Sequence, residues 1–263
     1  MGRFFRDTKK FRNYIVYAAK AALKNEVVDS YLNWVWWILE PFCFMLIYAF
    51  VFGVVFNTKE DYFPIFIYIG LTAWNFFSGT IKRSVRIVKR NKGIVSKVYL
   101  PKFVLNQTEI LVYGFKMLIS FALIVCMMVV FRLSPSIYLL NVIPLVFLLL
   151  LLSFGCMCIL SHIGVFISDL NKVINILLRI VFYMSGIFYS IENRLGPTYP
   201  NLAVLFGKIN PMAFIIQGLR NSIVYKQPIS WQYLLMWYAI AIGLICIGVT
   251  LIYKNENTYV KVI

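Results

Sequence analysis

Six long apolar stretches, separated by short polar connections, constrain the fold of this chain more than any other feature. The hydrocarbon core of a membrane is about 30 Å thick and takes about 20 helical residues to cross. Backbone groups in lipid must be satisfied within the segment, so each stretch is predicted to be a helix. We therefore expect an all-α integral membrane protein, one transmembrane domain over residues 1–263, with spans at 31–56, 62–81, 103–131, 139–167, 173–191 and 231–253.

The composition excludes the main soluble classes. Hydrophobic residues make up 61% of the chain and charged residues only 14%, against about 25% charged in soluble proteins. A soluble globule of this length leaves about a quarter of its surface in water, too much for such a sequence. Five cysteines within apolar stretches and the single His162 offer neither a disulfide framework nor a metal site.

The charges are distributed asymmetrically about the predicted spans. Of 26 Lys and Arg residues, 18 fall in connections on one side: seven in residues 1–30, eight in 81–102, one in 168–172 and two after the last span. Only six lie in the connections on the other side. Because cytoplasmic loops are enriched in Lys and Arg, both termini are predicted to be cytoplasmic.

The first 30 residues have the pattern of an amphipathic helix. Phe4, Phe11, Ile15, Ala18 and Ala22 recur at helical spacing, with cations on another face. Such a helix lies in the membrane interface, with its apolar face among the acyl chains. The alternative is an ordinary basic flank of the first span.

Residues 192–230 are apolar but repeatedly interrupted by Pro and Gly. A segment of this kind cannot cross as one straight helix. We expect short re-entrant gate helices here, on the outer side, in preference to a plain external loop.

Catalytic motifs are missing from the sequence. It contains no G-x-x-x-x-G-K-[ST], no G-x-S-x-G and no H-E-x-x-H. We expect no catalytic residue, metal or cofactor in this chain.

A few charged residues fall inside the spans, where each costs about 2.5–3.5 kcal/mol on insertion scales. Glu109 and Lys116 lie seven residues apart on one helical face, so they pair indirectly or meet other partners. Glu40 precedes Pro41 and is expected to pair with a cation or to cap freed amides. Arg179 either snorkels along its own stem or meets a phosphate on a lipid substrate.

Aromatic residues gather in the first, second and fifth spans. One interpretation is the interfacial belt of membrane proteins. The other is a substrate channel, since sugar rings stack on aromatic faces. The predicted channel residues are Trp34, Trp37, Phe42, Tyr48, Trp74, Phe77, Tyr183, Phe188 and Tyr189.

The connection 81–102 begins as a basic helix and ends with apolar side chains. A lipid-binding patch is basic throughout, so docking into a groove of another protein is favoured, although both can apply. The predicted coupling residues are Arg86, Lys89, Arg90, Lys97, Val98 and Tyr99.

Several segments, in order along nearly the whole chain, resemble motifs of the ABC-2 membrane subunits that export polysaccharides and polyol phosphates. Residues 29–41 (DSYLNWVWWILEP) resemble the family's S-x-L-G-x-x-W-x-x-x-x-P opening, and 91–102 (NKGIVSKVYLPK) resemble its stretch between spans two and three. Ser168-Asp169 stands where the family carries Arg-Asp. Residues 185–190 (SGIFYS) and 210–220 (NPMAFIIQGLR) resemble its Ser-Pro-Ile-x-Tyr and Asn-Pro-Met…Arg elements.

The resemblance implies a homodimer in the bacterial cytoplasmic membrane that exports an undecaprenyl-pyrophosphate-linked glycan, O-antigen or wall teichoic acid in type. ATP and Mg²⁺ would be bound by two copies of a separate ABC ATPase, docked on the 81–102 loop, and no nucleic-acid partner is expected. Membrane lipid or the pyrophosphate would meet Arg12, Lys24 and Arg179. Three positions depart from the pattern: Asn33 replaces Gly, Ser168 replaces Arg and Gly186 replaces Pro.

Two other function classes remain open from the sequence. An ABC-2 exporter of a small molecule or a capsule glycan keeps the fold and changes the cargo. A membrane enzyme acting on lipid-linked sugars would need clustered acids, and Glu40, Glu109 and Asp169 fall in different segments.

Overall fold

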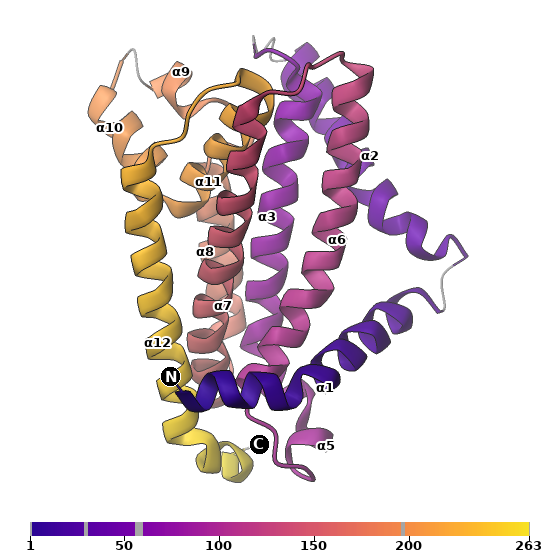
Figure 1. Cartoon of the computed structure of the whole chain (residues 1–263), viewed down its shortest axis with the longest axis vertical. Helices are drawn as coiled ribbons and strands as arrows, with labels where there is room; N and C mark the ends of the chain where they lie inside the picture. Colours follow the sequence, from indigo (N-terminus) through magenta and orange to yellow (C-terminus); the bar gives the residue numbers. More distant parts are fainter. Residues whose placement is uncertain (1, 29–30, 56–59, 196–197, 263) are drawn as a thin grey trace.

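The computed structural model describes residues 2–28, 31–55, 60–195 and 198–262, and every regular element among them is a helix. Residue 56 of the first predicted span, residues 196–197 of the gate region and residues 29–30 of the opening motif lie outside the described ranges. Among the described residues, five helical segments are long and apolar enough to cross a membrane, or six if one bent helix pair counts as a span, and most of the five stand upright in Figure 1. The predicted all-α membrane fold is confirmed.

The elements follow the predicted order along the chain. In sequence they are α1 (Gly2–Val27), η1 (Asn33–Val35), α2 (Trp36–Tyr48), η2 (Ala49–Val55), α3 (Phe63–Val85), α4 (Ile87–Arg90), α5 (Lys92–Val95), α6 (Phe103–Val130), η3 (Ile137–Asn141), α7 (Val142–Phe166), α8 (Leu170–Met184), α9 (Ile191–Leu195), α10 (Pro200–Val204), η4 (Leu205–Ile209), α11 (Pro211–Arg220), η5 (Asn221–Tyr225) and α12 (Trp231–Val262). The five spanning segments are Trp36–Val55, Phe63–Val85, Phe103–Val130, Ile137–Phe166 and Trp231–Glu256.

Helix α3 forms the centre of the bundle. All of its residues from Ile65 to Trp74 are buried, and it packs against α2, α6, α7, α8 and α11. Small residues let the helices approach closely, as is usual where apolar surface faces lipid and packing drives association. Gly164 of α7 lies directly against the carbonyl oxygen of Val85, and Gly155 of α7 lies against Leu244 of α12.

Helix α1 crosses the lower end of the bundle instead of running parallel to it (Figure 1). It packs on α6, and the Phe4 ring lies 4.9 Å from that of Phe103. Of the described residues of α1, only Ile15 and Ala19 are buried. Such a placement suits a helix in the plane of the membrane interface.

Helix α8, the predicted fifth span, is shorter than expected from the sequence. It ends at Met184 rather than near residue 191 and has 15 residues, about 22 Å at 1.5 Å per residue. The chain turns at Gly186, whose φ of +64° is left-handed. Glycine adopts this conformation without strain, whereas the family's proline is fixed near −65°.

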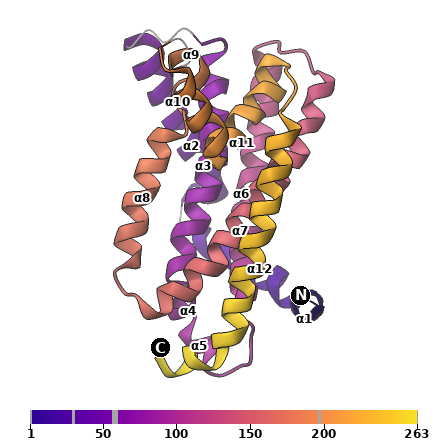
Figure 2. The ribbon, with the colours of Figure 1, turned by 90° about the vertical axis from the view of Figure 1, so that its left-hand side faces the viewer.

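The segment between α8 and α12 begins and ends at the same end of the bundle, opposite α1 (Figures 1 and 2). Its helices Pro200–Ile209 and Pro211–Tyr225 meet at a bend of 92°. Asn210 stabilises the bend, because its side chain accepts hydrogen bonds from the amides of Met212 and Ala213 at 3.0 and 3.4 Å. The segment therefore does not cross as one straight helix.

The close contact between α3 and α7 predicts that one added methyl group at Gly164 lowers the stability of the chain. We expect Gly164→Ala to lower the thermal unfolding temperature of the purified chain in detergent, because its Cβ would overlap the Val85 carbonyl; overpacking costs about 1–3 kcal/mol. Gly114→Ala in α6 is the control, since nothing lies within 4 Å of its Cβ position. Equal unfolding temperatures for the two variants would contradict the close packing.

Candidate functional site: an aromatic and basic cleft beside α3

The ring of Phe188, in the turn after α8, is the centre of an aromatic cluster. It stacks on Phe52 with centroids 4.5 Å apart and 7° between the planes. Tyr48 lies 4.6 Å away and Phe182 5.3 Å away. The cluster joins the outer half of the first span to α8, and such ring pairs stabilise by about 0.5–1.5 kcal/mol beyond their burial.

The ring contacts continue from this cluster along α3 and α8. Phe182 lies 5.3 Å from Trp74, which in turn lies 6.1 Å from Phe77. Tyr183 adjoins Phe182 at 5.3 Å. Five predicted channel residues thus belong to one chain of ring contacts: Tyr48, Trp74, Phe77, Tyr183 and Phe188.

The other predicted channel residues lie around or outside this chain of contacts. Tyr189 donates a hydrogen bond from its hydroxyl to the Tyr183 carbonyl at 2.9 Å. Phe42 packs against the core. Trp37 faces Phe115 of α6 at 5.9 Å, and Trp34 is exposed.

Below the cluster, a cavity of about 560 Å³ opens between α3 and α8. Figure 2 shows α8 on the flank of α3. The lining residues are Trp74, Lys82, Asn175, Leu178, Arg179, Phe182 and Tyr183. Two cations and no carboxylate therefore face aromatic rings, a combination suited to a phosphate with an attached sugar. Lys82 is not among the predicted headgroup residues, although the sequence places it at the basic end of an apolar span.

Arg220 at the end of α11 is the largest fully buried side chain of the described residues, with 1% of its surface exposed. Its guanidinium donates hydrogen bonds to the carbonyls of Phe66, Gly186 and Ile187 at 3.1, 2.8 and 2.7 Å. It also lies 3.4 Å from the centre of the Phe66 ring. Arg220 thereby holds the turn that carries Phe188 against α3.

Arg220 lies within the predicted gate segment 192–230, and counting charges by connection gave no partner for it. The only signal in the sequence was its place at the end of the Asn-Pro-Met…Arg element. That resemblance marks the residue without giving its partners.

The predicted intramembrane charges Glu109 and Lys116 do not pair with each other. Glu109 pairs with Arg90, and Lys116 pairs with Glu26 of α1 at 2.5 Å. Arg83 also reaches Glu26, at 3.4 Å. These pairs tie α1 and the basic loop to the lower part of α3 and α6.

Glu40 lines a separate cavity of about 340 Å³ between α2, α3 and α6. It forms no ion pair within the described ranges, so the expected partner is not found there. Lys116, Asn75 and Ser120 line the same cavity, and the buried hydroxyl of Thr72 has no protein partner. The cavity is therefore lined by polar side chains, although it lies between membrane-spanning helices.

The basic connection between α3 and α6 lies at the lower end of the molecule. Val98 and Tyr99 are 59% and 54% exposed, and Arg86, Lys89 and Lys97 are exposed beside them. Tyr99 accepts a hydrogen bond from Arg3 at 2.6 Å and donates one to Glu256 at 3.1 Å. The hydrogen bond to Glu256 raises the pKa of Arg3. This cluster joins α1, the loop and α12.

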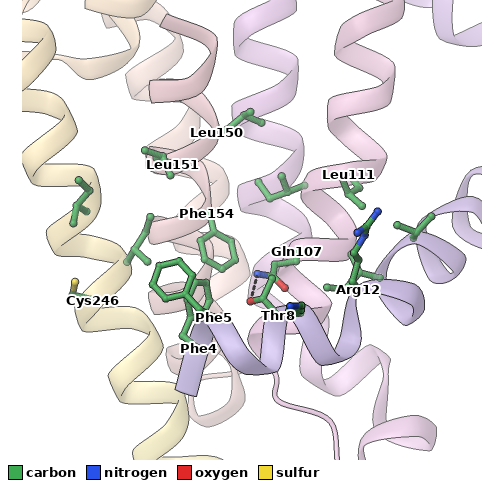
Figure 3. Close-up of a pocket in the computed structure, with 16 residues that line it drawn as sticks. Phe4, Phe5, Thr8, Arg12, Gln107, Leu111, Leu150, Leu151, Phe154 and Cys246 are labelled. Atoms are coloured by element: carbon green, nitrogen blue, oxygen red, sulfur yellow. Dashed lines mark hydrogen bonds between the residues drawn. The ribbon is translucent and has the colours of Figure 1, made fainter. Parts of the chain in front are cut away.

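The three predicted headgroup cations lie in three different places. Arg179 lines the α3–α8 cavity, whereas Arg12 lines a groove on α1, α6, α7 and α12 (Figure 3). Lys24 is exposed in the last turn of α1. Lys172, near the position where Ser168 replaces the family's arginine, pairs with Asp169 on the surface at 3.4 Å.

The apolar bundle with its basic connection is that of a multi-pass membrane protein. Residues 15–224 match the family model described as ABC-2 type transporter, and the chain belongs to this family. The resemblance predicted from its motifs is confirmed.

Relatives of the chain include permeases of polysaccharide export. It is 23% identical to the O-antigen export system permease protein RfbA of Klebsiella pneumoniae, over 92% of this chain and 91% of the relative. It is 23% identical to the Myxococcus xanthus protein of that name, over 86% and 85%. Identity to the Polysialic acid transport protein KpsM of Escherichia coli is 27%, over 78% and 80%.

The contacts of Arg220 predict a large loss of stability on a conservative change. We expect Arg220→Lys to destabilise the chain by about 2 kcal/mol or more, because a single ammonium cannot satisfy three carbonyls in the guanidinium's arrangement. Thermal unfolding of the purified chain in detergent measures the effect. Arg194→Lys, at an exposed position on α9, should leave the unfolding temperature unchanged; similar shifts in both variants would contradict this role.

Proposed function

We propose that this chain is the permease subunit of an ABC exporter that moves an undecaprenyl-pyrophosphate-linked polysaccharide, of O-antigen or wall teichoic acid type, across the bacterial cytoplasmic membrane. The observation that carries the proposal is the α3–α8 cavity, where Lys82 and Arg179 face Trp74, Phe182 and Tyr183. Its cations bind the pyrophosphate and its rings stack on sugars. Membership of the ABC-2 family and the similarity to O-antigen permeases support this cargo.

The aromatic cluster around Phe188 acts as the outer closure of the path. It lies between the first span and α8, on a turn whose carbonyls at Gly186 and Ile187 accept hydrogen bonds from Arg220. Movement of the segment 185–225 would separate these rings. The remaining predicted residues Trp34, Trp37 and Phe42 belong to the wall contributed by the first span.

Two copies of the chain complete the channel. In one copy the first span is mostly unburied. A second copy would cover its exposed rings and close the open side of the α3–α8 cavity. Two ATPase subunits dock on the basic loop, where Arg86, Lys89, Arg90, Lys97, Val98 and Tyr99 form the contact. Helix α1 lies in the inner interface, and both termini are cytoplasmic.

A second candidate cargo is a capsule glycan. It is favoured by the similarity to the polysialic acid transport proteins. Polyanionic and lipid-linked glycans both suit a basic, aromatic cavity, and they differ in whether a polyprenyl pyrophosphate is required.

Charge removal from the cavity tests the proposed cargo site. We expect Lys82→Gln with Arg179→Gln to reduce surface polysaccharide at least tenfold in a host whose own permease gene is deleted, because the anionic headgroup loses both cations. Blotting of surface glycan measures export, and immunoblotting of membranes confirms equal protein levels. Lys172→Gln, about two turns from Arg179 on α8 and exposed, is the control. Undiminished export in the double variant would contradict the proposal.

The coupling role of the loop predicts a specific loss of ATPase binding. We expect Val98→Asp to reduce recovery of the co-expressed ATPase with the tagged permease at least fivefold, because an acid replaces an exposed apolar contact. Thr258→Asp, at another exposed position near the lower end of α12, adds the same charge outside the loop and should keep the ATPase. Equal recovery from both variants would show that the loop is not the docking site.

A further inference from the structure

A second large cavity lies on a different flank of the bundle from the proposed cargo cleft. It is a groove of about 860 Å³ above α1, walled by α6, α7 and α12 (Figure 3). The walls are mainly apolar, with Phe4, Phe5, Ile110, Leu111, Leu150, Leu151, Phe154, Ile242 and Ile245 among the lining residues. Figure 2 shows α8 on one side of the bundle and α1 with α12 on the other. A molecule in this groove is therefore separated from the α3–α8 cavity.

The groove opens sideways to lipid and not to the interior of the bundle. Leu111 is 44% exposed, and Phe5 and Ile242 are also exposed large side chains. In a membrane protein such surfaces on the outward faces of spans meet hydrocarbon. The occupant of the groove must therefore have long apolar chains.

One side of the groove carries a charge without a protein partner. Arg12 points from α1 along α6 towards Leu111 (Figure 3) and forms no ion pair within the described ranges. Lys9 lines the groove as a second cation. A guanidinium beside hydrocarbon is costly unless an anion accompanies it, and a phosphate meets its donors in a bidentate geometry.

The acids on the helices that flank Arg12 are already engaged. Asp7 accepts a hydrogen bond from Tyr253 at 2.8 Å and pairs with Arg3 at 3.6 Å. Glu26 pairs with Lys116 and Arg83, and Glu109 pairs with Arg90. The missing anion therefore has to come from outside the chain.

We propose that this groove is a binding site for one anionic glycerophospholipid, distinct from the exported cargo. Its acyl chains fill the space between α1 and the faces of α6, α7 and α12, and its phosphate binds Arg12, with Lys9 alongside. Thr8 and Gln107, hydrogen-bonded at 3.1 Å, lie between the two parts. Since α1 buries little of its own surface, the lipid completes the packing of α1 against the bundle.

Binding of defined lipids to the purified full-length chain tests the proposal. Native mass spectrometry in detergent would follow titration with phosphatidylglycerol and, separately, with phosphatidylcholine. We expect one tightly held phosphatidylglycerol, bound at least tenfold more tightly than phosphatidylcholine. Arg12→Ala should weaken the phosphatidylglycerol site at least tenfold. Arg6→Ala, an exposed cation on α1 outside the groove, should change it less than twofold.

A second pair of variants tests the apolar part without altering charge. Leu111→Trp places a bulky ring in the groove and should abolish the tight site. Leu118→Trp, seven residues further along α6 on the same face and exposed, should keep it. The proposal is overturned if Arg12→Ala and Arg6→Ala weaken phosphatidylglycerol binding equally, or if the two phospholipids bind with equal affinity. It is also overturned if a competition titration shows that the groove binds undecaprenyl phosphate and neither phospholipid.

Discussion

A buried arginine that is hydrogen-bonded to backbone carbonyls holds together the end of the bundle opposite α1. A charge placed this deep is costly unless it is fully hydrogen-bonded. The guanidinium of Arg220 donates its hydrogen bonds to backbone carbonyls of α3 and of the turn after α8. The short α8 and the left-handed Gly186 make this possible, because the turn presents two successive carbonyls to one guanidinium. Arg220 has room because residue 70 of α3 is glycine. A Cβ at this position would lie 2.9 Å from Nη2 of Arg220.

The position of the aromatic cluster follows from this interaction. The turn fixed by Arg220 carries Phe188, and Phe188 stacks on the first span through Phe52 and Tyr48. Ring contacts thus close the space around Phe188, whereas the cations Lys82 and Arg179 line the cavity below it, between α3 and α8. Under the proposed function, this arrangement suits an exporter whose cargo enters at the Lys82 end of the cavity.

Hydropathy predicted the spanning helices well, because each must carry about 20 apolar residues whatever its neighbours are. It overestimated α8, since apolar residues of the turn at 185–190 continue the pattern while Gly186 ends the helix. It also could not place Arg220, because counting charges by connection ignores tertiary contacts. The aromatic residues were identified as a set, but which rings meet depends on the turn that Arg220 holds. Trp37 and Phe188 both carry aromatic rings, but Trp37 meets Phe115 of α6 and Phe188 meets Phe52 of the first span.

The excess of cations has several separate physical uses in this structure. Some cations are neutralised within the chain, as Arg90, Lys116 and Arg83 are by Glu109 and Glu26, and these fix α1 and the loop to the bundle. Arg220 forms no ion pair among the described residues, because its guanidinium is hydrogen-bonded to backbone carbonyls.

Arg12, Lys82 and Arg179 have neither kind of partner among the described residues, and each lines a cavity. A charge that the fold leaves unneutralised beside an apolar cavity indicates an external anion. The two cavities differ in what surrounds that anion, hydrocarbon around Arg12 and aromatic rings around Arg179, so one suits a resident phospholipid and the other a passing glycan.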